Sequence, residues 1–209
     1  MSRPKGDSDL RLIRAAQELL DERGFSGLKI RDVARKAGVN LGMFHYHFKS
    51  KENFEKHVMQ DVYERFFADF KLETSSAGTP LERLRRSLIN LSRFARDNRK
   101  LLLGIISDAA QGDAQVLRSV HVNFPRHALI VFSLIRECQK KGLIERMPLH
   151  LTVSLLFPAI MAPNIIMAVV EHKRVPSLIR FAVRGIKDEI LSDAVLVKRV
   201  DYTLRTVGV

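Results

Sequence analysis

The feature that most constrains the fold is a short segment, residues 29–52, whose pattern predicts two helices joined by a tight turn. Apolar residues recur at helical spacing in its first half and would give the first helix one buried face. Gly38 follows directly, and glycine ends helices because it adopts the left-handed backbone conformation without steric cost. Asn40 can then cap a second helix by accepting a free backbone N–H. The apolar residues are Ile30, Val33, Ala34 and Ala37.

The second predicted helix, residues 40–48, has two chemically different faces. Phe44 and Phe48 lie four residues apart and must point inward together. The outer face then carries an imidazole, a phenol and a glycine, which is unusual for a surface that only keeps a protein soluble. In a helix-turn-helix unit the second helix enters the major groove of DNA. The residues left outside are Leu41, Gly42, His45 and Tyr46.

Residues 10–52 resemble the DNA-binding domain of the tetracycline-repressor (TetR) family of transcriptional regulators. The resemblance lies in the segments 15–20, 24–25, 31–34, 37–39 and 44–52. It implies an all-α fold, with a helix-turn-helix DNA-binding domain in residues 1–52 and a helical ligand-binding and dimerisation domain in residues 53–209. The sequence departs from the family pattern at Lys29, where Thr or Ser is usual, at Asn40 and Leu41, and at Met43 to His45.

Eight residues are predicted to contact double-stranded DNA. Arg31 opens the first helix and is expected to reach a base edge or a phosphate, with a solvated surface arginine as the alternative. His45, Tyr46 and Lys51 are expected to donate hydrogen bonds to phosphates. Lys51 also starts the next helix, whose free N–H groups favour an anion. The full set is Arg31, Asn40, Leu41, Gly42, Met43, His45, Tyr46 and Lys51.

The apolar members of this set are assigned a different part in the contact. Leu41 and Met43 are expected to touch thymine methyl groups, and Gly42 would let the helix backbone approach the duplex closely. His47 is predicted to be structural.

The charge of the chain suits a polyanionic partner. The formal net charge is +12, and such an excess attracts polyanions. Residues 1–52 hold 11 basic and 7 acidic side chains, whereas the remainder holds 24 and 16, so the excess is spread along the chain. The local signal is stronger, because residues 29–51 hold six basic side chains and one acid.

The single cysteine, Cys138, excludes an internal disulfide and a multi-cysteine metal site, and it indicates a reducing cytoplasm. We interpret Cys138 as a small buried residue, with a redox sensor as the alternative. The charged amino terminus is not followed by an apolar run and does not predict a signal peptide. No metal or cofactor is expected.

Helices are predicted along the whole remaining chain. The first runs from Ser8 or Asp7 to about Arg23, with Leu10, Ile13, Ala16 and Leu20 inward. Ser50 caps a long helix that ends near residue 73. Thr79, Pro80 and Glu82 form a capping box with proline at the first helical position. Further helices are predicted at about residues 80–97, 100–111, 113–141, 148–172, 176–190 and 192–205.

The 20 residues from Leu151 to Val170 carry no charge. An apolar helix of about this length is long enough to span a bilayer. Because Pro158, Pro163 and Asn164 interrupt this run, we favour a soluble helix that is buried on most sides by packing against a second copy of the chain. The resemblance agrees, since late helices form a four-helix dimer interface in the family. The candidate interface residues are Leu155, Ala159, Ile166, Val183, Ile186 and Ile190.

The resemblance also implies a cavity for a small-molecule effector in the carboxy-terminal domain. Its candidate lining is apolar, so the ligand is expected to be hydrophobic. The candidates are Phe66, Phe67, Phe70, Phe94, Phe157 and Met161, and an ordinary core is the alternative for each.

The sequence therefore predicts a homodimeric transcriptional regulator, a repressor that binds a palindromic operator and is released by a small ligand. An enzyme is disfavoured, because there is no nucleophile elbow or phosphate-binding loop, and the His45-x-His47 spacing does not suit two zinc ligands on one helical face. A helical protein–protein adaptor is the main alternative, but it would leave the outer face of residues 40–47 unexplained.

Overall fold

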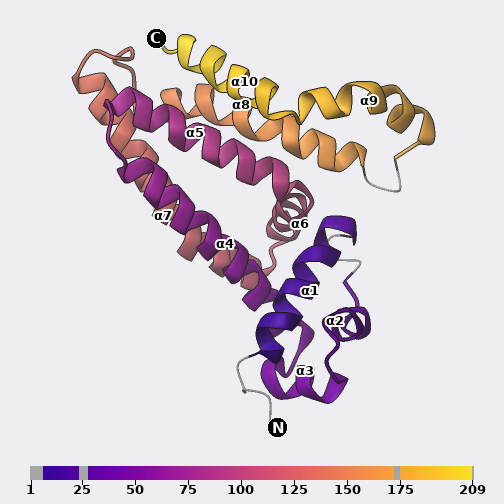
Figure 1. Cartoon of the computed structure of the whole chain (residues 1–209). Coiled ribbons are helices and arrows are strands. Elements are labelled where there is room, and N and C mark those ends of the chain that lie inside the picture. The colour runs from indigo at the N-terminus through magenta and orange to yellow at the C-terminus, as the bar shows by residue number, and fades with distance from the viewer. Residues whose placement is uncertain (1–6, 24–27, 172–174, 209) are drawn as a thin grey trace. The chain divides into compact units, whose positions relative to one another are not determined.

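The described part of the chain is built from helices alone (Figure 1). The structure is a computed structural model and describes residues 7–23, 28–171 and 175–208. Within these residues there are ten α-helices and no strand, which confirms the predicted all-α class. The helices are α1 (Ser8–Arg23), α2 (Ile30–Ala37), α3 (Leu41–Phe48), α4 (Lys51–Ser75), α5 (Pro80–Asp97), α6 (Arg99–Ala110), α7 (Ala114–Lys140), α8 (Leu149–Val170), α9 (Ser177–Ile190) and α10 (Asp193–Arg205).

Contacts divide the chain into two compact units. Unit 1 comprises residues 1–65 and 104–119, and unit 2 comprises residues 66–103 and 120–209. The division falls within α4, after Arg65, whereas the boundary predicted near residue 52 coincides with the start of that helix.

The core of unit 1 joins the first three helices to the start of α4. Its buried side chains include the predicted inner faces of α2 and α3. In α1 the predicted stripe is wrong at one end, because Leu10 is 46% exposed and Leu12 is fully buried instead. The apolar residues at 10, 12 and 13 fit two overlapping stripes, and packing against α2 selects the second. Its fully buried large side chains are Leu12, Val33, Phe44, Phe54 and Val58.

The helix ends of unit 1 follow the predicted local chemistry. Gly38 has φ 59° and ψ 39°, the left-handed conformation that ends α2. The Asn40 side chain caps α3 by accepting from the Gly42 N–H at 2.7 Å. Ser50 Oγ accepts from the Asn53 N–H at 3.1 Å and caps α4. Lys29 precedes α2 without a side-chain cap, as its departure from the family pattern implies.

Unit 2 is organised around α5, which packs against α8 and α10. Its start carries the predicted capping box, in which Thr79 and Glu82 each bond the other's backbone N–H. Leu84, Leu88 and Leu91 are buried along one face, at helical spacing. The helix is therefore both stopped from fraying at its start and fixed along its length by apolar contact.

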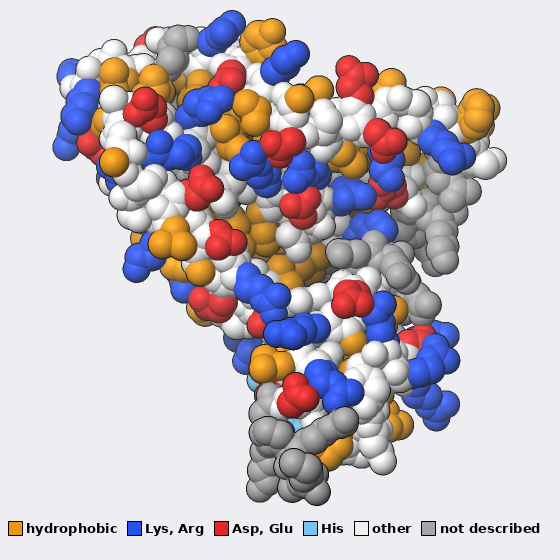
Figure 2. Space-filling model, in the orientation of Figure 1, with side chains coloured by type: hydrophobic (Ala, Val, Ile, Leu, Met, Phe, Trp, Pro, Cys, Tyr) orange, Lys and Arg blue, Asp and Glu red, His pale blue; other side chains and the backbone are white. Residues whose placement is uncertain are grey.

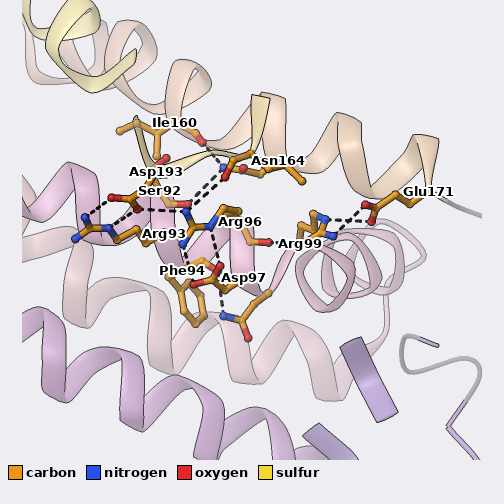
Figure 3. Close-up of polar contacts among 12 residues, drawn as sticks. Ser92, Arg93, Phe94, Arg96, Asp97, Arg99, Ile160, Asn164, Glu171 and Asp193 are labelled. Atoms are coloured by element: carbon orange, nitrogen blue, oxygen red, sulfur yellow. Dashed lines mark hydrogen bonds and ion pairs between the residues drawn. The ribbon is translucent and has the colours of Figure 1, made fainter. Parts of the chain in front are cut away.

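Arginines on α5 and at the start of α6 fasten these neighbouring helices through paired hydrogen bonds (Figure 3). Arg93 holds Asp193 of α10 with two bonds of 2.9 and 2.7 Å, and this contact lowers the pKa of the Asp193 carboxyl to about 2. Arg99 holds Glu171, just beyond α8, in the same bidentate manner at 3.1 and 3.0 Å. Lys187 of α9 also reaches Glu171, at 2.6 Å. Such pairs fix geometry more than they add stability, because they remain partly solvated.

Helix α8 is buried on one side only. Its inner face includes the amide of Asn164, which donates to the Ile160 carbonyl at 2.9 Å and to the Ser92 carbonyl of α5 at 3.5 Å (Figure 3). The sequence predicts that a second copy of the chain covers the rest of this helix, and this stays a prediction; in the single chain, five apolar side chains face outward. These are Leu151, Leu155, Phe157, Ile166 and Val169.

Among the described helices, α8 alone has the length and hydropathy that would suffice to cross a membrane, with 28% of its most apolar window buried. Its buried polar residues, Thr152 and Asn164, face the protein rather than the exposed side. This arrangement is that of a core helix with one unpartnered apolar face.

Cys138 is fully buried on α7, as predicted. Burial raises the pKa of its thiol to about 11. Because the thiolate is the reactive form, this environment makes the residue inert and disfavours a redox sensor.

Candidate nucleic-acid interface

The outer face of α3 is an exposed surface of mixed chemistry. Tyr46 is 68% exposed, and His45 and Gly42 are also exposed. Leu41 and Met43 are each 37% exposed, at the amino-terminal end of the same helix. The face thus presents a phenol, an imidazole and two apolar side chains within two helical turns.

The inner face of α3 is held by an aromatic cluster. Phe44 and Phe48 are buried, and the ring of Phe54 on α4 lies 5.0 Å from the first and 4.7 Å from the second, both edge-on. Edge-to-face contacts of this kind favour one arrangement of rings over others. The cluster therefore fixes the rotation of α3 about its axis, and with it the side chains that face outward.

The start of α3 has no side chain at Gly42. A Cβ placed there would lie 3.4 Å from the Asn40 Oδ1 atom that caps the helix, which is an ordinary van der Waals contact. Glycine at this position leaves the outer surface open.

The predicted basic contacts flank α3. Arg31 is exposed in the first turn of α2. Lys51 begins α4, and its ammonium lies 3.5 Å from Glu55 Oε1. A partly exposed i, i+4 pair of this kind contributes little to stability. Basic side chains are also spread over the visible surface of both units, as the sequence indicates (Figure 2).

The sequence analysis did not predict that two further basic residues, Lys49 and Arg11, lie beside α3. Lys49 ends the helix with φ 62°, a conformation that is uncommon for a residue with a side chain. Arg11 on α1 donates from its guanidinium to the carbonyls of Ala37 and Gly38, the second at 2.9 Å. Neither has a local pattern that would reveal it, because one depends on a single backbone angle and the other on a contact across 26 residues.

His47 lies between the two faces of α3. It is half-buried, its ring stands edge-on to Tyr46 at 5.2 Å, and its Nε2 atom is buried without a hydrogen-bond partner. This position agrees with the structural role that we predict for it.

Three of the six residues predicted to line an effector cavity come together in unit 2. The ring of Phe66 lies 5.4 Å from Phe70 and 4.2 Å from Phe94. His127 of α7 stands edge-on to Phe66 at 5.6 Å, and burial lowers its pKa to about 4, partly offset by a hydrogen bond to the Asn123 backbone. The cluster is thus an aromatic interior with one neutral imidazole.

The other cavity candidates lie elsewhere. Phe67 is half-buried under the guanidinium of Arg126, 4.2 Å from the ring centre. Phe157 is 39% exposed on the outer side of α8, and Met161 is half-buried one turn further on. A hollow of about 430 Å³ in unit 2 is lined instead by Arg136, Gln139, Lys140, Arg146, Met147 and Pro148.

The predicted interface residues lie on an apolar surface formed by α8 and α9. Leu155, Ile166 and Ile186 are exposed, and Ala159, Val183 and Ile190 are half-buried. The sequence missed the most exposed members of α9, Leu178 and Phe181, which are 77% and 75% exposed. Exposed apolar residues on two neighbouring helices are typical of a protein interface.

The comparisons with known proteins agree with one another. The model of the bacterial regulatory proteins of the tetR family matches residues 12–56. The transcriptional repressor KstR2 of Mycolicibacterium smegmatis is 31% identical over 100 residues, which are 48% of each chain. The chain spans between 48% and 62% of the length of the first curated relatives that it matches.

Solved structures resemble the chain over nearly its full length. A TetR transcription regulator from Haloarcula marismortui has a TM-score of 0.73 at 17% identity, covering 96% of this chain and 98% of that one. FadR from Bacillus subtilis, in complex with stearoyl-CoA, has a TM-score of 0.63 at 17% identity, covering 90% and 97%. At such identities the likeness shows the fold. The family match covers the helix-turn-helix segment, residues 12–56, and the likeness to solved TetR-family regulators extends their fold to nearly the whole chain.

Proposed function

We propose that this protein is a homodimeric transcriptional repressor that binds a palindromic DNA operator through α3 and is released by a small hydrophobic ligand. The observation that carries the proposal is the outer face of α3, where His45 and Tyr46 are exposed while Phe44 and Phe48 anchor the helix. Residues 1–52 would form the DNA-binding domain, and residues 53–209 the sensing and dimerisation domain.

The chemistry of α3 suits a duplex better than a protein partner. The phenol and the imidazole donate hydrogen bonds to phosphates, and Leu41 and Met43 offer apolar contact to thymine methyl groups. Arg31 and Lys51 add positive charge on either side of the helix. A protein–protein adaptor would not require this combination of side chains. The relatives are also named as transcriptional regulators.

The dimer is supported by the apolar surface of α8 and α9. Its residues lose contact with water only if another surface covers them, which favours association. A two-fold dimer presents two copies of α3, and two copies read an inverted repeat with an affinity that one short helix does not reach.

The effector is supported by the aromatic interior of unit 2 and by the FadR structure, which holds stearoyl-CoA. Phe66, Phe70 and Phe94 supply apolar surface, and the neutral imidazole of His127 supplies a hydrogen-bonding group without charge. This combination favours a hydrophobic ligand with a small polar group.

The remaining parts of the proposal concern location and chemistry. A DNA target and a free, buried Cys138 support a cytoplasmic location. Its relatives are named as regulators, so we propose no enzymatic activity.

The test is selection of bound sequences from a random pool of duplex DNA with the full-length protein. The proposal predicts recovery of one motif with two half-sites related by a two-fold axis, at fixed spacing. A lone half-site would contradict the dimeric mode of binding, and recovery of no motif would contradict sequence-specific binding.

A further inference from the structure

Arg11 of α1 occupies an unusual position at the turn between α2 and α3. Its Nη2 atom donates to the carbonyl oxygens of Ala37 and Gly38, the second at 2.9 Å. On the other side of the guanidinium, Asp7 Oδ2 lies 4.0 Å from Nη1. The side chain is 31% exposed, so most of its length is packed against the protein.

These two carbonyls lie where α2 ends and the turn begins. The last carbonyls of a helix have no partner within it. Here the Gly38 and Val39 N–H groups return to the carbonyls of Arg35 and Ala34, at 3.1 and 3.0 Å. Ala37 and Gly38 follow after Lys36, and Arg11 Nη2 donates to both of their carbonyls. Its positive charge also lies at the negative end of the α2 dipole.

The turn approaches the guanidinium closely. A Cβ placed on Gly38 would lie 2.9 Å from Arg11 Nη2, and its φ of 59° already disfavours a side chain. Asn40, which caps α3, follows two residues later. The contact therefore acts on the short piece of backbone that sets the direction in which α3 leaves α2.

We infer that Arg11 is a positioning residue for DNA recognition, which holds the α2–α3 turn in its binding geometry without itself contacting the duplex. This inference rests on the proposed DNA-binding function. It is specific to arginine, because a planar guanidinium offers several donors in a fixed fork, whereas lysine offers one flexible ammonium.

The experiment compares Arg11→Gln and Arg11→Lys with Arg14→Gln, an exposed arginine on the same helix. Backbone amide exchange is measured at Gly38 and Val39, and affinity for the selected operator is measured at several salt concentrations. We expect amide exchange at the turn to accelerate about 10-fold and operator affinity to fall about 10-fold in Arg11→Gln, with a smaller change of both in Arg11→Lys. Arg14→Gln should change neither.

The salt dependence separates positioning from contact. Each lost phosphate contact reduces the slope of log affinity against log salt by about 0.9. An unchanged slope in Arg11→Gln, with faster exchange at the turn, is the expected result. A slope reduced by about one at unchanged exchange would identify a phosphate contact and overturn the inference, as would wild-type affinity in Arg11→Gln.

Amide exchange also keeps this inference separate from the proposed function. If the wild-type protein bound no DNA, the proposed function would fail and the recognition role of Arg11 with it. Faster exchange in Arg11→Gln would then still show that Arg11 fixes the turn. If global unfolding accelerated exchange at every amide in Arg11→Gln, Arg11→Lys would decide, and uniform acceleration there would overturn a local role.

Discussion

Units 1 and 2 each carry an exposed helical surface, and the two surfaces differ in chemistry. On α3 of unit 1, a phenol and an imidazole stand among basic neighbours. On α8 and α9 of unit 2, the exposed surface includes large aliphatic and phenylalanine side chains, with Phe181 75% exposed. Polar donors suit a hydrated polyanion, whereas a continuous apolar face suits another apolar face. Exposure alone therefore does not indicate which class of partner a surface binds. Exposure considered together with the hydrogen-bonding groups of the surface does indicate it.

The two units also place histidine side chains in opposite environments. His45 points to solvent from α3, but His127 is packed among phenylalanine rings in unit 2. One is available to donate to a partner, and the other is held neutral by burial. The difference separates a recognition surface from an interior.

The largest effect should come from a charge on the α8 face. Ile166 is 55% exposed, and Ile166→Glu would bury an unpaired carboxylate in a dimer. We expect the substitution to weaken dimer formation by about 4 kcal/mol, which raises the dissociation constant roughly a thousandfold. Sedimentation velocity should then show monomers. Leu72→Glu, at a 70% exposed position of α4, is the control and should remain dimeric. If the Ile166→Glu protein remained dimeric, the result would show that α8 is not part of the dimer interface.

The half-buried His127 should make unit 2 sensitive to acid. Its pKa of about 4 lies below the ordinary 6.5, so between these values the unfolded chain binds a proton that the folded chain does not. Stability therefore falls as the pH is lowered from 7 to 5, by about 2 kcal/mol. Urea unfolding at both pH values should show this loss in the wild type and its absence in His127→Phe.

The control for this prediction is His150→Gln, which alters an exposed histidine outside the aromatic cluster. It should keep the wild-type difference between pH 7 and pH 5. An equal loss in His127→Phe and the wild type would show that other groups cause the acid sensitivity.

The recognition face should show its effect in binding and not in assembly. His45→Ala and Tyr46→Ala should each weaken operator binding by about 1–2 kcal/mol, about 5- to 30-fold, and leave the dimer intact. Gel shift and sedimentation measure the two quantities. Tyr202→Ala, an exposed tyrosine of unit 2, is the control. Wild-type affinity in both α3 variants would contradict the assignment of this face.

The smallest effect should come from the α3 cap, where two roles of one residue can be separated. Asn40→Ala removes the acceptor of the Gly42 N–H and should cost about 1 kcal/mol of stability. Asn40→Asp keeps the cap but adds a negative charge beside the phosphates. We expect it to retain stability and lose DNA affinity. Equal affinity in Asn40→Asp would show that this end of α3 lies away from the duplex.

Local chemistry was predictable from the sequence, and contacts across the chain were not. Gly38, Asn40 and the Thr79–Glu82 box act on neighbouring residues, so their sequence patterns determine the helix ends. The helical stripe of α1 failed at Leu10, because two stripes fitted the same residues and only packing distinguished them.

Arg11 and the ion pairs of α5 illustrate the other limit. The contact of Arg11 spans 26 residues, and that of Arg93 with Asp193 spans 100. Many arginines and carboxylates are available in the chain, and their pairing follows from the packing of the helices. The candidate face of α3 was predictable because helical spacing alone decides which of its residues point outward.

The central claim, that the outer face of α3 meets a duplex, is tested most directly by the affinity of the full-length protein for duplex DNA across a series of salt concentrations. The account predicts measurable binding at low salt that weakens steeply, with a slope of log affinity against log salt of about −4 or steeper, since each phosphate contact contributes about −0.9. Absence of binding at low salt, or a slope near zero, would contradict it.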